Sequence, residues 1–305
     1  MTEAIDAFVN EQMALQHLPG LSLLVTRDGV PIFAQSYGLA NLELQVPTHN
    51  HSVYELGSLT KSFTATAVML LAADQLLRLD DPITSYQSTD SAPSSWNTIT
   101  IQHLLTHTAG ITRDGITDYW STPHLMRQEY SREQLLELLT AMVLDFAPGT
   151  EHRYSNAGYF LLGLIIEAAT GQTFAQVLAA RIFDPLGMTE THINHRQLLI
   201  PHRVAGYVWN EHGWENAPVI GLSHHFADGG IVSSIMDIAK WEAALTNSTL
   251  LSAEHLRQMW SPHVLVDGSL IDYGYGWMCI HQEGHQLVAH GGAIPGFTAY
   301  MARFL

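Results

Sequence analysis

A serine followed three positions later by a lysine is the part of the chain best suited to chemistry. Ser58 and Lys61 lie in the stretch YELGSLTKSFTATAVMLLAA at 54–73, which ends in a nearly unbroken apolar run at 65–73. The apolar run predicts a buried helix beginning at Ser58, and the spacing places both side chains on one face, a turn apart. N–H groups at a helix start stabilise negative charge, and an amine in apolar surroundings loses its proton more readily. The pattern therefore predicts a serine nucleophile activated by lysine.

A structural interpretation of the same residues stands beside the catalytic one. A serine commonly caps a helix N-terminus, and a lysine commonly lays its stem along apolar surface with its ammonium in water. Because the pattern is short, the rest of the chain has to decide between a catalytic pair and a capped helix.

A second candidate is Tyr154-Ser155-Asn156, directly before the apolar segment AGYFLLGLIIEAA at 157–169. In extended backbone, residues two apart point the same way, so Tyr154 and Asn156 would share a face. The phenol is suited to carrying a proton at the reacting atoms, and the amide to binding a substrate carbonyl or Lys61. The alternative is a tyrosine that packs at a helix entrance, with Asn156 as the N-cap.

A third candidate is His290-Gly291-Gly292, in a predicted strand near the end of the sequence. Two glycines weaken a strand unless another group has to approach its backbone closely. A substrate along this strand edge would meet that condition, and the N–H groups of Ala293 and Ser58 would then form an oxyanion-binding pair. The alternative is an ordinary β-bulge.

The composition is that of a folded, acidic protein. The chain has 305 residues, of which 47% are hydrophobic and 14% charged, and 29 acids against 13 bases give a net charge of −16. Such a charge disfavours nucleic acids and anionic membranes as partners. Residues 1–20 carry early acids and no continuous apolar core, unlike a signal peptide, and no stretch reaches the roughly 18 apolar residues of a membrane span. A single cysteine, Cys279, excludes an internal disulfide, and we expect a cytoplasmic protein.

The 18 histidines raise the question of a metal site. The close pairs are His103/His107, His192/His195, His224/His225 and His281/His285. None of them forms an HExxH motif or has a cysteine nearby, so we expect no metal and no cofactor.

The elements that position these residues follow from periodicity and turn signals. Strands are expected near both ends and helices in the middle, which predicts an α/β (α+β) fold: an antiparallel sheet from both termini with an inserted helical lobe. The lobes are expected at 1–57 plus 205–305 and at 58–204. Helices are predicted at 3–16, 58–81, 102–106, 131–143, 157–169, 173–181, 234–245 and 252–260, and strands at 21–26, 30–37, 273–281, 286–290 and 297–305. Loops are predicted at 38–51 and 84–98, and irregular structure at 111–130.

The three candidates, in this order, resemble the serine β-lactamase and penicillin-binding-protein superfamily. The chain is most similar to the branch holding class C β-lactamases, D-aminopeptidases, DD-carboxypeptidases and β-lactamase-like esterases. The resemblance covers nearly the whole chain and includes ELGSLTKSFTA, IQHLLTHTAGI, FAPGTEHRYSNAGYFLLGLIIEAATG, DPLGM, DGGIVSSIMDIAKW and YGYGW.

The resemblance implies a role for each candidate residue. Ser58 would be the acylated nucleophile and Lys61 its base, while Tyr154 would pass a proton to the leaving group and Asn156 would position the substrate. The THTAG loop, the segment DGG at 228–230 and the YGYGW strand look structural. His107 is expected to be a satisfied core residue.

Two departures from the family pattern shape the expected function. His290 and Gly291 stand where relatives carry Lys and Thr of a K-T-G triplet, which weakens recognition of a substrate carboxylate. An imidazole titrates at about pH 6.5 and is largely neutral at pH 7, unlike a lysine; the alternative is that His290 only packs or bonds to Tyr154. The family normally continues with a further strand and a C-terminal helix beyond the strand at 297–305. We therefore expect an exposed strand edge there, and oligomerisation or poor solubility.

The combined expectation is a serine hydrolase working through an acyl-Ser58 intermediate on small esters or amides, of the esterase or D-amino-acid peptidase type. The alternatives are a β-lactamase or DD-carboxypeptidase, or a penicillin-binding sensor that is acylated but does not turn over.

Overall fold

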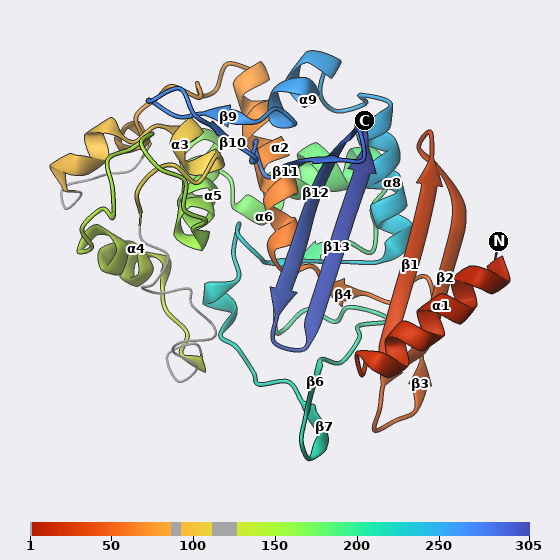
Figure 1. The fold of residues 1–305 in the computed structure, drawn as a ribbon. Helices are drawn as coiled ribbons and strands as arrows, with labels where there is room; N and C mark the ends of the chain where they lie inside the picture. Colours follow the sequence, from red (N-terminus) through yellow and green to blue (C-terminus); the bar gives the residue numbers. More distant parts are fainter. Residues whose placement is uncertain (1, 87–92, 112–126) are drawn as a thin grey trace.

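Both ends of the chain form antiparallel β-structure in the computed structural model, which describes residues 2–86, 93–111 and 127–305 (Figure 1). The N-terminal elements are α1 (Thr2–Leu15), β1 (Gly20–Arg27), β2 (Val30–Asn41) and β3 (Val46–Pro47). Asp28 and Gly29, between β1 and β2, have φ of 52° and 74°. A two-residue hairpin turn of type I′ requires this left-handed conformation at both positions, which explains the Asp-Gly pair.

At the other end, two hairpins build a three-stranded sheet in the order β11-β12-β13. The strands are β11 (Met278–Gln282), β12 (His285–Ile294) and β13 (Phe297–Phe304). Ile294 pairs with Phe297 across a two-residue turn, so hydrogen bonds join β13 to the even-numbered residues of β12. Gln286 fits this alternation, because its carbonyl accepts a hydrogen bond from the Leu305 N–H at 3.0 Å.

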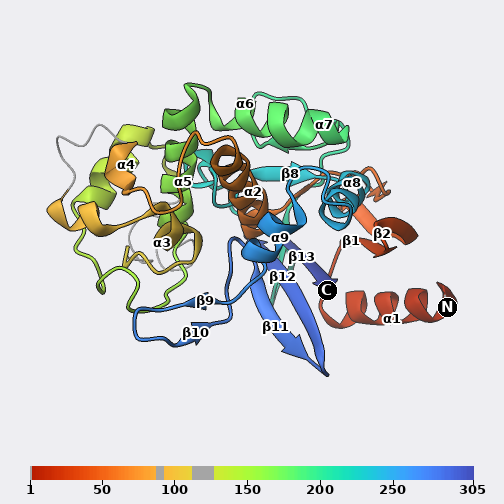
Figure 2. The ribbon, with the colours of Figure 1, turned by 90° about the horizontal axis from the view of Figure 1, so that it is seen from above.

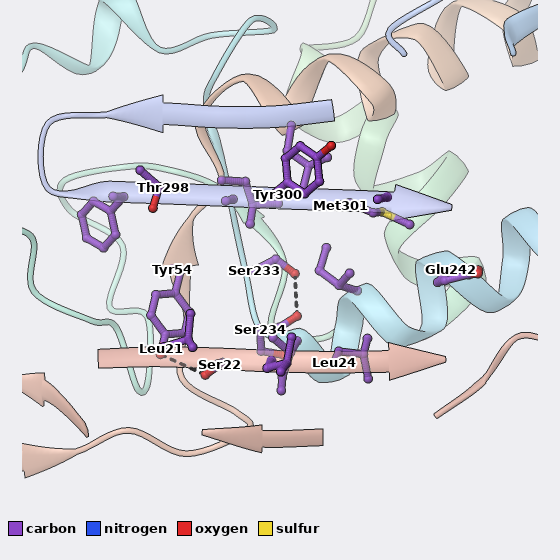
Figure 3. A pocket seen from close by; sticks show the side chains of 18 of the residues that line it. Leu21, Ser22, Leu24, Tyr54, Ser233, Ser234, Glu242, Thr298, Tyr300 and Met301 are labelled. Carbon is purple, nitrogen blue, oxygen red and sulfur yellow. Dashed lines mark hydrogen bonds between the residues drawn. The ribbon is translucent and has the colours of Figure 1, made fainter. Parts of the chain in front are cut away.

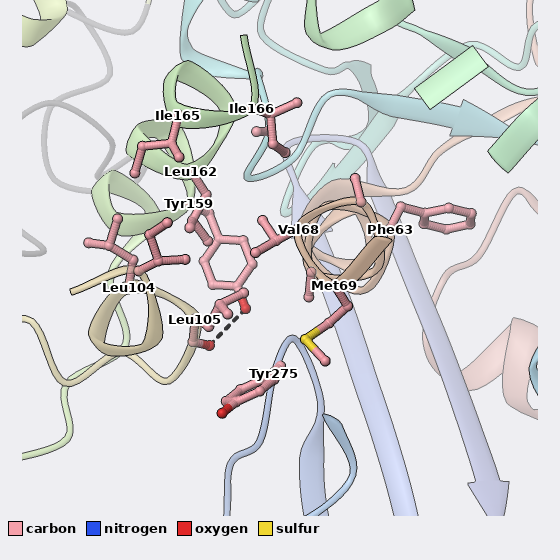
Figure 4. Packing of buried hydrophobic residues seen from close by; sticks show 14 of the residues in the cluster. Phe63, Val68, Met69, Leu104, Leu105, Tyr159, Leu162, Ile165, Ile166 and Tyr275 are labelled. Carbon is pink, nitrogen blue, oxygen red and sulfur yellow. Dashed lines mark hydrogen bonds between the residues drawn. The ribbon is translucent and has the colours of Figure 1, made fainter. Parts of the chain in front are cut away.

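The middle of the chain is helical and packs around α2. The helices are α2 (Thr60–Ala73), α3 (Ile101–Leu105), α4 (Arg132–Thr140), α5 (Asn156–Thr170), α6 (Phe174–Leu178) and α7 (Asp184–Leu186). Every side chain of α2 from Thr60 to Leu71 is buried, as its apolar sequence predicts. Figure 2 shows α2 between the α6–α7 segment and the β11–β13 sheet. Figure 4 shows Tyr159 and Leu162 of α5 facing Val68 of α2 in the core.

A second small sheet, in the order β4-β8-β5, fixes the chain just before Ser58. Its strands are β4 (Tyr54–Glu55), β5 (His192–Ile193) and β8 (Ile231–Ser233). The remaining elements are β6 (Tyr207–Asn210), β7 (Gly213–Asn216), α8 (Ile235–Thr246), α9 (Ala253–Met259), β9 (His263–Val264) and β10 (Leu270–Ile271).

The structure corrects both ends of the helix that was predicted over 58–81. The helix begins at Thr60, because residues 57–59 form a 3-10 turn. It ends at Ala73, well before Pro82, because Gln75 takes a left-handed φ of 60° that no helix can continue through.

Several other predictions placed a boundary wrongly. The strand predicted at 286–290 runs from His285 to Ile294, paired with β13 in unbroken register through both glycines, without the β-bulge that was the alternative. The helix predicted at 131–143 ends at Thr140. The predicted loop at 38–51 contains the end of β2 and all of β3, since β-pairing continues past Gly38. The helix predicted to stop at 181 continues through a π-helical turn (Ala179–Phe183) to Leu186. The proline at 185 does not end it, because it lies in the first turn of α7, where its missing N–H is not needed. The strand predicted from 273 begins at Met278, after Gly276 turns the chain with a φ of 74°.

The loop predicted at 84–98 and the irregular segment predicted at 111–130 lie partly outside the described residues, at 87–92 and 112–126. Within the predicted loop, Ser94–Thr98 forms a 3-10 helix. Within the described ranges, no single helix meets the length and hydropathy of a membrane span. Helix α5 and residues 174–186 reach that length and hydropathy only when they are taken together, and the chain bends by 78° between them.

One edge of β13 faces a groove. In the described part of the chain β13 pairs with β12 alone, and a groove of about 1460 Å³ lies between it and β1. Figure 3 shows the two strands along opposite sides of this space, with Tyr54 and Ser233 between them. The strand expected at 297–305 is therefore present, with one edge open. Ser58 is not among the residues that line the groove.

Candidate active site

Ser58 lies in the 3-10 turn that leads directly into α2. The chain before it is fixed by the Leu56 N–H, which donates to a carbonyl of β8 at 2.9 Å. Gly57 has a φ of 52°, and a Cβ there would lie 3.1 Å from the backbone nitrogen of Ala293. Glycine meets both conditions without strain. The turn therefore holds the half-buried Ser58 at the start of a buried helix and lays its backbone against β12.

Lys61 is fully buried, with 0% of its surface exposed, and its Nζ contacts three oxygen atoms. These are Ser58 Oγ at 3.1 Å, Asn156 Oδ1 at 2.8 Å and the Asp228 carbonyl at 2.8 Å. The amide and carbonyl oxygens only accept, so they occupy two N–H donors whatever charge the amine carries. In the ammonium the third N–H donates to Ser58, whereas in the neutral amine the third position is a lone pair directed at the Ser58 hydroxyl. This is the geometry that a lysine base for Ser58 requires.

Tyr154 and Asn156 reach the same place from the start of α5. The Nζ atom of Lys61 lies 4.9 Å from the centroid of the Tyr154 ring. Ser155, not Asn156, is the N-cap of α5, and its extended backbone (φ −138°, ψ 121°) lets the residues on either side of it approach Lys61 together. The structure thus brings Ser58, Lys61, Tyr154 and Asn156 into one cluster.

The glycine-rich part of β12 presents its free edge to the Ser58 turn. Because even-numbered residues bond to β13, the N–H groups of Gly291 and Ala293 point the other way, where β11 leaves β12 unpaired. At Gly292 a Cβ would lie 1.9 Å from the Leu56 carbonyl oxygen and 2.9 Å from the Ser58 nitrogen. The two backbones are therefore in contact next to the Ser58 and Ala293 nitrogens, and the oxyanion-binding role of their N–H groups stays a prediction.

His290 is buried, and both of its ring nitrogens are hydrogen-bonded. Nε2 lies 2.9 Å from the Tyr273 hydroxyl and Nδ1 lies 2.7 Å from the Gly291 carbonyl oxygen. Since a carbonyl only accepts, Nδ1 carries the proton and Nε2 accepts from the phenol. Burial, followed by the charge of Lys61, lowers the pKa of His290 from 6.5 to about 3. His290 is therefore neutral at pH 7, as expected, but the titration expected near pH 6.5 was wrong. Of the alternative, the packing is present, but the hydroxyl that His290 binds is that of Tyr273 and not that of Tyr154.

Two parts of this cluster were missed in the sequence. The Asp228 carbonyl binds Lys61, but a backbone oxygen leaves no side-chain signal, and the segment DGG at 228–230 looked purely structural. Tyr273, in the YGYGW segment at 273–277, also looked structural. The available signal was that a buried tyrosine hydroxyl needs a partner, which here is His290.

The paired histidines do not gather around one point. His103, for example, accepts the Thr100 N–H at 3.1 Å and so helps to cap α3. Among the residues that the structure describes, no three His, Cys, Asp or Glu side chains are arranged to hold a metal ion.

The chain matches the Beta-lactamase family over residues 5–304. Penicillin-binding protein 4* of Bacillus subtilis (strain 168) is 30% identical, over 97% of this chain and 67% of its own length. The D-aminopeptidase of Brucella ovis is 28% identical, over 96% of this chain and 55% of its own. The chain thus spans about two thirds of the first relative and little more than half of the second.

Solved structures share the fold. A penicillin-binding protein homologue from Pyrococcus abyssi, described as octameric, has a TM-score of 0.85 and 28% identity, covering 99% of this chain and 70% of its own. The D-amino acid amidase of Ochrobactrum anthropi SV3, complexed with L-phenylalanine amide, has a TM-score of 0.82 and 25% identity, covering 96% and 85%. These likenesses confirm the predicted fold class, antiparallel sheets combined with an inserted helical region.

Proposed function

Because the chain belongs to the Beta-lactamase family, as its sequence resemblance predicted, we propose that it is a serine hydrolase acting through an acyl-Ser58 intermediate on small esters or amides. The observation that carries the proposal is the contact between Lys61 Nζ and Ser58 Oγ, with the other two positions of the amine occupied by Asn156 and Asp228.

Acylation follows from these contacts. Ser58 Oγ attacks the carbonyl carbon of the substrate while its proton passes to the lone pair of neutral Lys61. The negative charge that develops on the carbonyl oxygen is stabilised by the N–H groups of Ser58 and Ala293. The bond to the leaving group then breaks, and Tyr154, beside Lys61, relays the proton to the leaving oxygen or nitrogen.

Deacylation reverses the same proton path. A water molecule attacks the acyl carbon, its proton returns through Tyr154 or Lys61 to Ser58 Oγ, and the acid is released. Asn156 supports both steps because its Oδ1 fixes the Lys61 amine, which leaves its Nδ2 group free of that contact and available to a substrate carbonyl.

We propose that the acyl group is not anionic. His290 stands where a lysine would attract a carboxylate, yet it is buried, and both ring nitrogens are already bonded within the protein. It therefore offers no charge to a substrate anion. Relatives named D-aminopeptidase support amides of D-amino acids as one group of substrates. Esters of short uncharged acids are the second group, because they need no cation at His290.

The names of other relatives favour a second candidate function. Proteins described as penicillin-binding share the family and the fold, so a β-lactam target that is acylated and released slowly is the alternative. Both functions use the same nucleophile, so they differ only in how fast the acyl-enzyme is hydrolysed.

A burst assay separates them. Purified protein is mixed with p-nitrophenyl butyrate, D-alanine p-nitroanilide and, separately, the cephalosporin nitrocefin. Sustained product release from the first two supports the hydrolase, and release that stops after one equivalent supports the sensor. No release by wild type above the level of Ser58→Ala with any substrate would contradict the proposed function.

We also propose that the protein forms homo-oligomers. The open edge of β13 and the groove beside it offer unpaired backbone groups and apolar side chains, and the Pyrococcus abyssi relative is described as octameric.

A further inference from the structure

His107 bonds to both neighbours of Tyr154. Its carbonyl accepts the Arg153 N–H at 2.9 Å, and its Nδ1 accepts the Ser155 N–H at 3.2 Å. The imidazole also packs against the Tyr154 ring, with centroids 4.3 Å apart and planes inclined by 38°. One residue thus fixes the backbone on both sides of Tyr154 and the ring between them.

The tautomer of this imidazole follows from the same contacts. Because Nδ1 accepts a hydrogen bond, the proton lies on Nε2. The side chain is 2% exposed, and burial lowers its pKa well below 6.5, so the ring is neutral. The Nε2 group has no hydrogen-bond partner in the part of the chain that the structure describes.

Residue 107 is an unfavourable place for a side chain that serves packing alone. Its φ of 57° is a left-handed conformation that is uncommon for any residue with a side chain, although histidine adopts it more often than most. A buried N–H without an acceptor adds a second penalty, which a purely apolar ring would avoid. The features that set histidine apart here are the flat ring against Tyr154 and the acceptor for Ser155, and both act on Tyr154.

We propose that His107 is a positioning residue for Tyr154, holding its phenol ring beside Lys61, where Nζ lies 4.9 Å from the ring centroid. The inference rests on the proposed function, because Tyr154 matters only if a proton is transferred there. His107 is a buried core residue, as expected, but it is not fully satisfied, because Nε2 has no partner among the described residues. Its other contacts lead to the reacting groups.

Two substitutions test the ring contact with Tyr154 and the hydrogen-bond acceptor for Ser155 separately. His107→Phe keeps a flat ring and loses the acceptor for Ser155, whereas His107→Asn keeps an acceptor near the position of Nδ1, tolerates the backbone conformation and loses the ring contact. His103→Asn is the matched control, because His103 lies in α3 and its bond to Thr100 caps that helix. Each variant is also made in a Tyr154→Phe background.

The readouts are kcat and KM with p-nitrophenyl butyrate, and thermal melting by circular dichroism. We expect His107→Phe to lower kcat about 10- to 100-fold with KM changed less than about threefold, and His107→Asn to lower kcat less. In the Tyr154→Phe background the same substitutions should change kcat by less than about threefold, because residues that act through one another are not additive. His103→Asn should keep wild-type kcat.

Equal fold-losses in the two backgrounds, or wild-type kcat in a folded His107→Phe, would overturn the inference. If His107→Phe does not fold, His107→Asn in the wild-type and Tyr154→Phe backgrounds provides the same comparison. A wild type that hydrolyses none of the substrates contradicts the proposed function instead, so the two failures are distinguishable.

Discussion

Replacing Gly292 with alanine should open the oxyanion-binding pair. The added Cβ would lie 1.9 Å from the Leu56 carbonyl oxygen and 2.9 Å from the Ser58 nitrogen. To reach the 3.4 Å of ordinary contact, β12 and the Ser58 turn must separate by about 1.5 Å. Both neighbours are backbone atoms, so no side-chain rotation relieves the contact. The N–H groups of Ala293 and Ser58 then no longer converge on one oxygen.

The size of the effect depends on the contribution of a single donor. Loss of one oxyanion donor lowers kcat by about 10²- to 10³-fold, which corresponds to about 3–4 kcal/mol. Overpacking costs about 1–3 kcal/mol of stability, against a total of about 5–15 kcal/mol for a folded domain. Gly292→Ala should therefore fold, melt at a lower temperature and lose most of its activity.

Gly291→Ala is the matched comparison on the neighbouring residue. Its Cβ would first meet the Tyr300 ring, at 3.4 Å, which is ordinary contact. We expect kcat with p-nitrophenyl butyrate to fall less than about tenfold in Gly291→Ala and at least about 100-fold in Gly292→Ala. Folding is checked by circular dichroism. A folded Gly292→Ala with wild-type kcat, or equal losses in both variants, would refute the placement of the oxyanion pair.

Three further predictions concern His290 and the open edge. The double variant His290→Lys, Gly291→Thr should raise the ratio of kcat/KM for an anionic cephalosporin to kcat/KM for p-nitrophenyl butyrate roughly tenfold. The reason is that a lysine adds the positive charge that the neutral imidazole lacks. An unchanged ratio would show that His290 only packs. Acid should destabilise the protein, because the pKa of His290 is about 3 in the folded state and near 6.5 in the unfolded state. The contribution of the neutral imidazole to the free energy of unfolding is complete above pH 6.5. It is lost as the pH falls toward 3, at up to about 1.4 kcal/mol per pH unit. Urea titrations of His290→Gln should show a shallower loss over that range, and identical slopes would contradict this. Light scattering should report particles larger than the 33.8 kDa chain, and a monodisperse monomer would contradict oligomerisation.

The sequence alone predicted that Ser58 and Lys61 lie together, even though the predicted start of the helix was wrong. Residues three apart nearly eclipse in a 3-10 turn and neighbour each other in an α-helix, so the spacing brings the side chains together in either geometry. The strands predicted at 21–26 and 30–37 and the helix start predicted at 131 were equally direct, because the Asp28-Gly29 turn and the Ser131 cap of α4 each depend on a few adjacent residues.

Contacts between distant segments could not be predicted from such local signals. The Asp228 carbonyl reaches Lys61 across 167 positions of sequence, and a backbone oxygen has the same chemistry at every residue. The role of His290 depends on burial and on Tyr273, which packing decides. The bonds from His107 to the residues around Tyr154 likewise require the folded loop, since neither segment alone indicates the other.

The most direct test of the account is to locate the acyl adduct. The protein is treated with a fluorophosphonate probe, digested and examined by mass spectrometry, beside Ser58→Ala and Ser62→Ala. Ser62 is a buried serine of α2 that donates to the Leu59 carbonyl at 2.8 Å, so its loss should leave labelling intact. We predict one adduct, on Ser58, absent from Ser58→Ala and retained in Ser62→Ala. An adduct on another residue, or labelling that persists in Ser58→Ala, would contradict the assignment of Ser58 as the nucleophile.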